Sequence, residues 1–315
     1  MSRVTVVGSY IVALVMDMDR LPVEGETVMG RNFHITHGGK GSNMAAAAAR
    51  LGAEVEFLGK IGRDSHGQAF LDLLKQEKVG ARGVMTTDTS PTATGIIFFT
   101  DRGTNAIAID RGANGELTRD DVASQRGLIG VGDIVLSPLE ISLDTARAAA
   151  ERACQQGGMA ILNPAPAQDL RHENLSAFFA LTPNETEARV CLGLAPDDRT
   201  PEEVLADRLL DLGAPNVIIT LGAQGALWAS RAGQRHIPAL RVNAIDMVGA
   251  GDAFNAGLAV GLSEGRSLLE AVCLGVTAAS LSTEKRETIA SYPFRAEVEA
   301  RLAEVLAAAQ PGRSP

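Results

Sequence analysis

Residues 246–257 combine small and acidic side chains in a spacing that could support phosphoryl transfer. Gly249, Ala250 and Gly251 lead into Asp252, and a helical pattern continues to Leu262. A glycine turn at a helix start leaves N–H groups uncovered at the positive end of the helix dipole, where anions bind. Asp252 could then remove a proton from a hydroxyl group while these amides stabilise the transferring charge. An equally good interpretation of this stretch alone is that Asp252 is a helix N-cap.

A second glycine-rich segment, residues 37–43, precedes an alanine-rich stretch that predicts a helix over 44–51. Glycines in front of a helix let a ligand approach the backbone closely, and Lys40 and Asn43 can reach hydroxyl or phosphate oxygens. The segment is not a P-loop, because that motif needs a glycine five positions before Gly39 and the sequence has His34 there. A plain glycine turn before an ordinary helix would give the same pattern.

Apolar runs rich in β-branched residues alternate with helical patterns over much of the chain. Strands are predicted over 4–7, 54–61, 134–136, 159–162, 179–181 and 217–220, and helices over 67–77, 143–156, 184–192 and 201–213. Such alternation, regular from about residue 118, predicts parallel strands with helices on both faces of the sheet. Binding residues are therefore expected in loops at the carboxyl ends of the strands.

Two further pairs of strand-like segments have no helical pattern between their members. They are residues 10–16 with 27–35, and residues 94–100 with 106–110 around a turn at 101–103. These hairpins predict a small β lid, from about 10–36 and 92–110, on a single domain covering 1–315. The fold class is therefore α/β, with a central, mostly parallel sheet, helices on both faces and a small β lid.

Several polar segments directly follow predicted strands. Glu140 could accept hydrogen bonds from a polyol, and the acids of residues 182–187 could hold hydrated Mg²⁺. Residues 182–187 would equally make a good helix N-terminus. Residues 220–225 form a glycine loop that suits a nucleotide phosphate or a plain turn. Each segment alone is ambiguous, but their shared position after strands favours one common site.

Composition narrows the class of protein. The 315 residues are 45% hydrophobic and 21% charged, which suffices for a large globular core. A net charge of -9 disfavours nucleic acid or an acidic membrane as a partner. Three cysteines far apart in the sequence disfavour structural zinc and favour a reducing compartment. No apolar run approaches the roughly 18 residues of a membrane span, and no signal segment precedes the first strand. We expect a soluble, cytoplasmic protein.

Five segments, taken in order, resemble the ribokinase (PfkB) family of carbohydrate kinases over nearly the whole chain. They are Gly38-Gly39-Lys40-Gly41-Ser42-Asn43, Asn163-Pro164-Ala165-Pro166, Thr182-Pro183-Asn184-Glu185-Thr186-Glu187, Thr220-Leu221-Gly222-Ala223-Gln224-Gly225 and the stretch through Asp252. The set is specific for the family and much less so for the substrate. The resemblance implies a ribokinase-like fold and ATP-dependent transfer of the γ-phosphoryl group to a hydroxymethyl group of a sugar.

The resemblance also implies roles for individual residues. The catalytic base would be Asp252, and the anion hole would be formed by the amides of Gly249, Ala250 and Gly251. The sugar would contact Gly39, Lys40, Asn43 and Glu140 as well as the base. The nucleotide would lie along Asn184, Thr220, Gly222, Gly225 and Gly251. Glu187, together with Asn184, would organise Mg²⁺ and phosphate, with water between the carboxylate and the metal.

Further implications concern ions and partners. Asp246 and the backbone of Val248 match positions that help hold an activating monovalent cation, such as K⁺, in ribokinases. Residues 285–288 replace the glycine-bearing segment that lines the cation and adenine region in that family, which leaves cation activation open. The partners would be ATP and a small sugar or sugar-like substrate. The lid would form the contact of a homodimer.

One departure from the family concerns the acceptor. Ribokinases usually have Gly-Ser-x-Asn-x-Asp after the first strand, and this Asn and Asp bind sugar hydroxyls. Here Ile11 and Ala13 take their places. Asp17 and Asp19 would compensate only if the strand were out of register. Because a site built to hydrogen-bond a hydroxyl depends on those partners, we expect a substrate less polar on that side, or a different sugar.

Three functions are consistent with the sequence. The first is a sugar kinase of altered specificity. The second is a nucleoside kinase of the same superfamily, with the apolar residues 10–13 facing a base. The third is a non-catalytic sugar- or nucleotide-sensing protein, against which the intact Asp252 and glycine turn argue. Turnover across a range of acceptors distinguishes the three.

Overall fold

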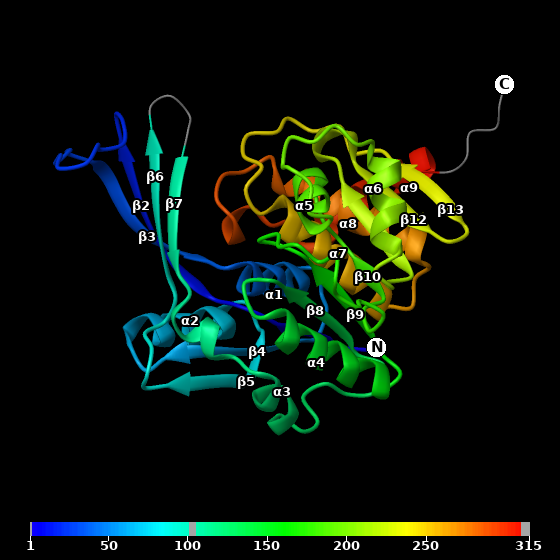
Figure 1. Ribbon diagram of the computed structural model, residues 1–315, viewed down its shortest axis with the longest axis horizontal. Helices are drawn as coiled ribbons and strands as arrows, with labels where there is room; N and C mark the ends of the chain where they lie inside the picture. The colour runs from blue at the N-terminus through cyan, green and yellow to red at the C-terminus, as the bar shows by residue number, and fades with distance from the viewer. Residues whose placement is uncertain (1, 101–104, 310–315) are drawn as a thin grey trace.

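The computed structural model describes residues 2–100 and 105–309. In these ranges the strands form two sheets, and the smaller one stands away from the main body (Figure 1). The order in the large sheet is β13-β12-β11-β10-β9-β8-β1-β4-β5, and in the small sheet it is β3-β2-β6-β7. The large-sheet strands are β1 (Val4–Val7), β4 (Val55–Gly62), β5 (Gly80–Thr87), β8 (Ile134–Pro138), β9 (Met159–Asn163), β10 (Ala180–Leu181), β11 (Asn216–Thr220), β12 (Ala226–Ser230) and β13 (Gly233–Ile237).

The small sheet contains β2 (Ile11–Met18), β3 (Arg31–Gly38), β6 (Thr94–Thr100) and β7 (Asn105–Asp110). The helices are α1 (Lys40–Arg50), α2 (Ser65–Gln76), α3 (Arg119–Ser124), α4 (Leu143–Gln155), α5 (Glu185–Cys191), α6 (Glu202–Leu210), α7 (Ala250–Ser263), α8 (Leu268–Ser282) and α9 (Arg295–Ala309). Short 3-10 helices lie at η1 (Gly112–Glu116), η2 (Gly222–Gln224) and η3 (Ile289–Ser291). No helix in the described ranges is long and apolar enough to cross a membrane.

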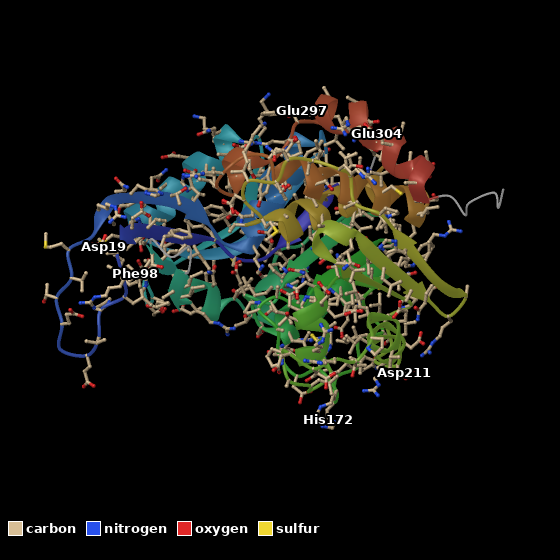
Figure 2. All side chains as sticks on the ribbon, turned by 90° about the horizontal axis from the view of Figure 1, so that it is seen from above. Asp19, Phe98, His172, Asp211, Glu297 and Glu304 are labelled. Atoms are coloured by element: carbon tan, nitrogen blue, oxygen red, sulfur yellow. The ribbon has the colours of Figure 1, made fainter. Side chains whose placement is uncertain are left out.

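The large sheet is buried on both faces. Helices α1, α2, α7, α8 and α9 share one hydrophobic core with it, and α3 to α6 share the other. In β1, Val6 packs into the first core and Val7 into the second, as expected for a parallel strand that reads as a continuous apolar run. Figure 2 shows Glu297 and Glu304 of α9 on the opposite side of the molecule from His172 and Asp211. The predicted α/β class, with helices on both faces, is confirmed.

Three details of the predicted strands are wrong. Strands β12 and β13 were not predicted. They extend the large sheet beside β11 in antiparallel fashion, because the short loop through η2 cannot make the long crossover that a parallel neighbour of β11 would need. Strand β5 was not predicted, since it lies at the sheet edge, is half exposed and contains Gly80 and Gly83. The strand expected over 27–35 begins instead at Arg31 and continues to Gly38.

The two expected hairpins meet in the small sheet. Strand β2 pairs with β3 in antiparallel fashion and with β6 in parallel, and β6 pairs with β7. Side chains alternate between the faces, so Leu14 shares one face with its partners Ile35 and Ile96. Ala13 and its partner Gly95 lie on the other face. The predicted turn at 101–103 lies outside the described residues.

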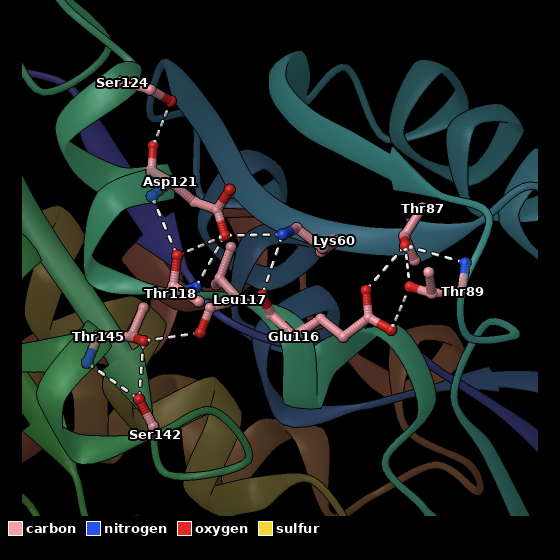
Figure 3. Close-up of polar contacts among 10 residues, drawn as sticks. All are labelled: Lys60, Thr87, Thr89, Glu116, Leu117, Thr118, Asp121, Ser124, Ser142 and Thr145. Carbon is pink, nitrogen blue, oxygen red and sulfur yellow. Dashed lines mark hydrogen bonds and ion pairs between the residues drawn. The ribbon is translucent and has the colours of Figure 1, made fainter.

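A polar network attaches the segment that leaves the small sheet to the main body (Figure 3). Lys60 of β4 donates to Oδ2 of Asp121 at 2.7 Å and to the carbonyl of Glu116 at 2.9 Å. The Glu116 carboxylate in turn accepts hydrogen bonds from the hydroxyl groups of Thr87 and Thr89, both at 2.7 Å. The chain that follows β7 is therefore held at the carboxyl ends of β4 and β5.

Candidate active site

The glycine turn of residues 249–251 starts helix α7. Gly249 is the N-cap residue, has a φ of 82° and receives no side-chain cap. The first N–H groups of a helix have no intrahelical partner, although that of Ala250 donates to the Met247 carbonyl at 3.2 Å. A Cβ atom on Gly251 would meet no heavy atom within 4 Å, so its backbone is open to a ligand. The backbone of the turn is therefore accessible at Gly251, and the anion hole expected there stays a prediction.

Asp252 lies in the first turn of α7 and is buried, with 4% of its surface exposed. Asn43 donates to its Oδ2 at 2.8 Å, and the Lys40 ammonium lies 3.9 Å from its Oδ1. Burial raises the pKa of Asp252 above its ordinary value, while Lys40 and then Asn43 oppose this shift. The oxygen of the same Asn43 amide, Oδ1, is buried and has no partner among the described residues. A carboxylate, a cation and a free acceptor thus converge.

Helix α1 supplies Lys40 and Asn43 from its first turn, after Gly39 at a φ of 92°. A Cβ on Gly39 would lie 2.7 Å from the Ile11 nitrogen, so the glycine lets this loop pass against β2. Burial alone would lower the pKa of Lys40, but the neighbouring carboxylates raise it above its ordinary value; they are Asp252, Glu187 and Glu140. Lys40 is therefore held as a cation.

Glu140 positions the start of α1. Its Oε2 accepts the Lys40 backbone N–H at 2.8 Å and a hydrogen bond from the Ser9 hydroxyl. The Ser9 oxygen also accepts the Gly41 N–H at 3.3 Å. Ser9 follows β1 and is fully buried, but sequence reasoning gave it no role. The only signal available was its place after a buried strand.

A chain of hydrogen bonds links two strand ends to the glycine turn. Asn163, the last residue of β9, donates to the Thr182 carbonyl at 2.8 Å, and the Thr182 hydroxyl donates to Asn255 Oδ1 at 2.6 Å. Asn255 then donates to the Gly251 carbonyl at 2.9 Å. Asn255 was also missed, although a lone amide on an otherwise apolar helix is a signal for such a buried network. The network holds the backbone of the glycine turn in place through the Gly251 carbonyl.

Asn184 and Glu187 form a capping box at the start of α5. The Asn184 side chain accepts the Glu187 N–H, and the Glu187 carboxylate accepts the Asn184 N–H, both at 2.8 Å. The helix N-terminus expected as one interpretation of this segment is therefore present. Asn184 also forms a β-bridge with Thr220. Burial raises the pKa of Glu187, and the Lys40 ammonium partly opposes this, so its carboxylate lies within the field of the Asp252 cluster.

A cleft of about 650 Å³ adjoins the glycine turn. Its walls include all five residues that the resemblance assigned to the nucleotide, namely Asn184, Thr220, Gly222, Gly225 and Gly251. Apolar side chains such as Phe254 and Val276 complete it, and the volume suits a ligand of nucleotide size. A larger, shallow hollow of about 860 Å³ around Arg3 and Asp133 lies at the amino ends of β1 and β8, away from this cluster.

Asp246 joins the glycine turn to the segment after α8. Its Oδ1 accepts the Val248 N–H at 3.0 Å, and its Oδ2 accepts the Glu287 N–H at 3.2 Å. Glu287 has a φ of 70°, which aims its amide at the carboxylate. Each oxygen keeps a lone pair for a cation. Within the described ranges, no group of three or more His, Cys, Asp or Glu side chains could hold a metal ion.

Ile11 and Ala13 lie where the small sheet meets the glycine-rich segment of residues 37–43. Both are 6% exposed, and Ile11 pairs with Gly38, next to Gly39. Ala13 pairs with Gly95 of β6. Strand β2 is therefore not shifted in register at Ile11 and Ala13. Asp17 lies at the far end of β2, where it accepts a hydrogen bond from Asn32 at 2.9 Å. The β2 residues that lie against Gly38 and Gly39 are therefore apolar.

Known proteins resemble this chain over most of its length. The model of the pfkB family carbohydrate kinases matches residues 1–295. A ribokinase of Haemophilus influenzae is 37% identical over 293 residues, covering 93% of this chain and 96% of that protein. A crystal structure of ribokinase from Thermotoga maritima superposes with a TM-score of 0.87 at 32% identity, covering 96% of this chain and 100% of the other.

A second structure, Arabidopsis thaliana ribokinase complexed with ribose and ATP, gives a TM-score of 0.84 at 28% identity over 96% of this chain and 99% of the other. These matches cover almost the whole chain. The chain therefore belongs to the pfkB family of carbohydrate kinases, and is a phosphotransferase with an alcohol group as acceptor.

Proposed function

We propose that the chain transfers the γ-phosphoryl group of ATP to a hydroxymethyl group of a sugar that is less polar than ribose on the side facing β2. The observation that carries the chemistry is the buried Asp252, held between Lys40 and Asn43 at the start of α7. The observation that carries the specificity is the apolar pair Ile11 and Ala13.

Asp252 is the catalytic base. It takes the proton of the acceptor hydroxyl as that oxygen bonds to the γ-phosphorus, and ADP leaves with the electrons of the broken bond. A pKa raised by burial makes Asp252 a better proton acceptor than an ordinary aspartate. The amides of Gly249, Ala250 and Gly251 stabilise the charge on the phosphoryl oxygens, and Lys40 neutralises part of it.

ATP lies in the 650 Å³ cleft along Asn184, Thr220, Gly222, Gly225 and Gly251. Glu187 fits hydrated Mg²⁺, because Mg²⁺ is usually held by one or two carboxylates together with waters and substrate phosphates. The metal would neutralise charge on the β- and γ-phosphates. Asp246 and the Val248 backbone remain the proposed site of a monovalent cation such as K⁺.

The acceptor lies between Asp252 and β2, against Gly39 and near Lys40, Asn43 and Glu140. The unpartnered Oδ1 of Asn43 is placed to accept a hydrogen bond from a substrate hydroxyl. The same apolar β2 residues favour a second candidate, a nucleoside whose base lies on Ile11 and Ala13. A non-catalytic sensing protein is disfavoured by the intact Asp252 cluster.

The small sheet is proposed to act as the lid of a single domain and as the contact of a homodimer. Its face with Ile35, Leu14 and Ile96 exposes large apolar side chains, with Ile35 56% and Ile96 42% exposed. An apolar row on a sheet that stands free of the body suits a second copy. Sedimentation velocity should show a dimer, and the variant Ile35→Lys/Ile96→Lys should sediment as a monomer. A monomeric parent protein would contradict this proposal.

The test of function is ADP release with MgATP across ribose, deoxyribose, fructose, other ketoses, sugar acids and nucleosides. A single class of acceptor that supports turnover names the substrate. Turnover of ribose well above all other sugars would contradict the proposed specificity. Binding of ATP without turnover of any acceptor would favour the sensing protein instead.

A further inference from the structure

Tyr292 brings a buried hydroxyl group to the turn at Gly249. Its side chain is 1% exposed, and its hydroxyl has no hydrogen-bond partner among the described residues. A Cβ on Gly249 would lie 2.7 Å from this oxygen and 3.2 Å from Cγ2 of Thr288. Ala250 and Gly251 line the nucleotide cleft but Tyr292 does not, so the hydroxyl contacts the turn from the other side. The mechanism above makes no use of it.

The backbone that carries Tyr292 is firmly fixed. Arg50, at the end of α1, donates to the Ile289 carbonyl at 2.6 Å and to the Tyr292 carbonyl at 3.2 Å. The same guanidinium binds Glu77 with two hydrogen bonds, at 2.8 and 2.9 Å, and lies 5.1 Å from the centre of the Phe294 ring. Since α1 also carries Lys40 and Asn43, the hydroxyl is placed relative to the catalytic cluster by one rigid helix.

An unpartnered buried hydroxyl destabilises a folded protein, and phenylalanine would fill the same space without that cost. Such a group therefore needs an explanation. Burial raises the pKa of Tyr292 well above its ordinary value, so the phenol stays neutral and keeps a proton to donate. The hydroxyl lies against the turn at Gly249, the N-cap of the helix whose first residues line the cleft.

We propose that Tyr292 is a positioning residue for the turn. Its hydroxyl donates a hydrogen bond to the backbone carbonyl of Gly249 when a transferring phosphoryl group is bound on the side of the turn that faces the cleft. This inference rests on the proposed function. Hydrogen-bonded peptide groups polarise one another, so a donor behind the turn makes the amides in front of it stronger donors. Those amides then stabilise the developing charge more than they stabilise bound nucleotide.

The test is calorimetric binding of MgADP, with and without aluminium fluoride as a mimic of the transferring phosphoryl group, to the full chain. For Tyr292→Phe we expect unchanged affinity for MgADP and about tenfold weaker binding of the aluminium fluoride complex, the typical effect of one hydrogen bond. With an acceptor found by the screen, kcat should fall by about the same factor while KM for ATP is unchanged. The melting temperature without ligand should stay equal or rise.

Thr5→Val is the matched control, because Thr5 in β1 also has a fully buried hydroxyl without a partner among the described residues. It should stabilise the fold and leave both affinities unchanged. A wild-type preference for the aluminium fluoride complex that Tyr292→Phe keeps would overturn this inference alone. So would a lower melting temperature of Tyr292→Phe, which would show that the hydroxyl already has a partner. Equal wild-type affinity for both complexes would overturn the proposed function as well.

Discussion

The two sides of the acceptor site are built on opposite principles. On one side, Asp252, Lys40 and Asn43 are charged or polar, lie on helix starts and are linked to one another at 2.8 to 3.9 Å. On the other, Ile11 and Ala13 belong to a small sheet that stands away from the body (Figure 1). In the proposed function the first side carries out the reaction, because it holds charge and protons. The second side holds no charge or proton, so its residues can differ between proteins that act on different substrates.

The largest effect should follow removal of the base. Asp252→Asn keeps the size and an acceptor for the Asn43 amide, but cannot take a proton. We expect kcat to fall by about 100-fold or more, with ATP still bound, because general base catalysis is worth this much. Steady-state ADP release and calorimetric binding of MgATP measure the two quantities. Retention of more than a tenth of the activity would contradict the assignment of the base.

The apolar side can be tested by making it polar. Ile11→Asn/Ala13→Asp restores the pair that ribokinases carry, and we expect kcat/KM for ribose to rise about tenfold relative to the natural acceptor. Met16→Asp, on the opposite face of the same strand, is the control and should give no gain. An equal gain from both variants, or from neither, would show that the face of β2 does not select the acceptor.

This contrast also explains what the sequence could predict. Strands such as β1 and β8 are buried on both faces, so their apolar runs are unmistakable. Strands β5 and β13 could not be placed in the same way, because edge strands carry half-exposed side chains and weaker patterns. The meeting of Asp252 with Lys40 and Asn43 was implied only by the family resemblance, because neither α1 nor α7 directly follows a parallel strand of the large sheet.

Single polar residues were the other limit of sequence reasoning. Ser9 acquires its role from Glu140, 131 positions away, and Asn255 from Thr182, 73 positions away. Nothing local in either residue indicates the partner. Tyr292 is a similar case, since its significance comes from contact with Gly249 in space. Such roles follow from packing, and the sequence pattern contains no record of them.

The charge of Lys40 should control how kcat/KM depends on pH, through the pKa of Asp252. Burial raises the pKa of Asp252 and the ammonium opposes this. Lys40→Met removes the opposition, so the base stays protonated to higher pH and the acid limb of the kcat/KM profile moves upward. Lys40→Arg keeps the charge and should leave that limb nearer its original position. A profile that does not move in Lys40→Met would mean that the limb reports another group.

The smallest effect compares backbone strain on the two sides. Glu287, beside Asp246, has a φ of 70°, and Asn32, on β3 of the small sheet, has a φ of 54°. A left-handed conformation costs a residue such as Glu about 1 kcal/mol, whereas Asn tolerates it. Because glycine also loosens the unfolded chain, Glu287→Gly should gain only about 0.5 kcal/mol in urea unfolding. Asn32→Gly should gain nothing, since it loses the 2.9 Å bond to Asp17. If Glu287→Gly were instead less stable than the parent protein, the Glu287 side chain would have to make a contact that outweighs the backbone strain. The polar side would then not be the less stable of the two because of strain.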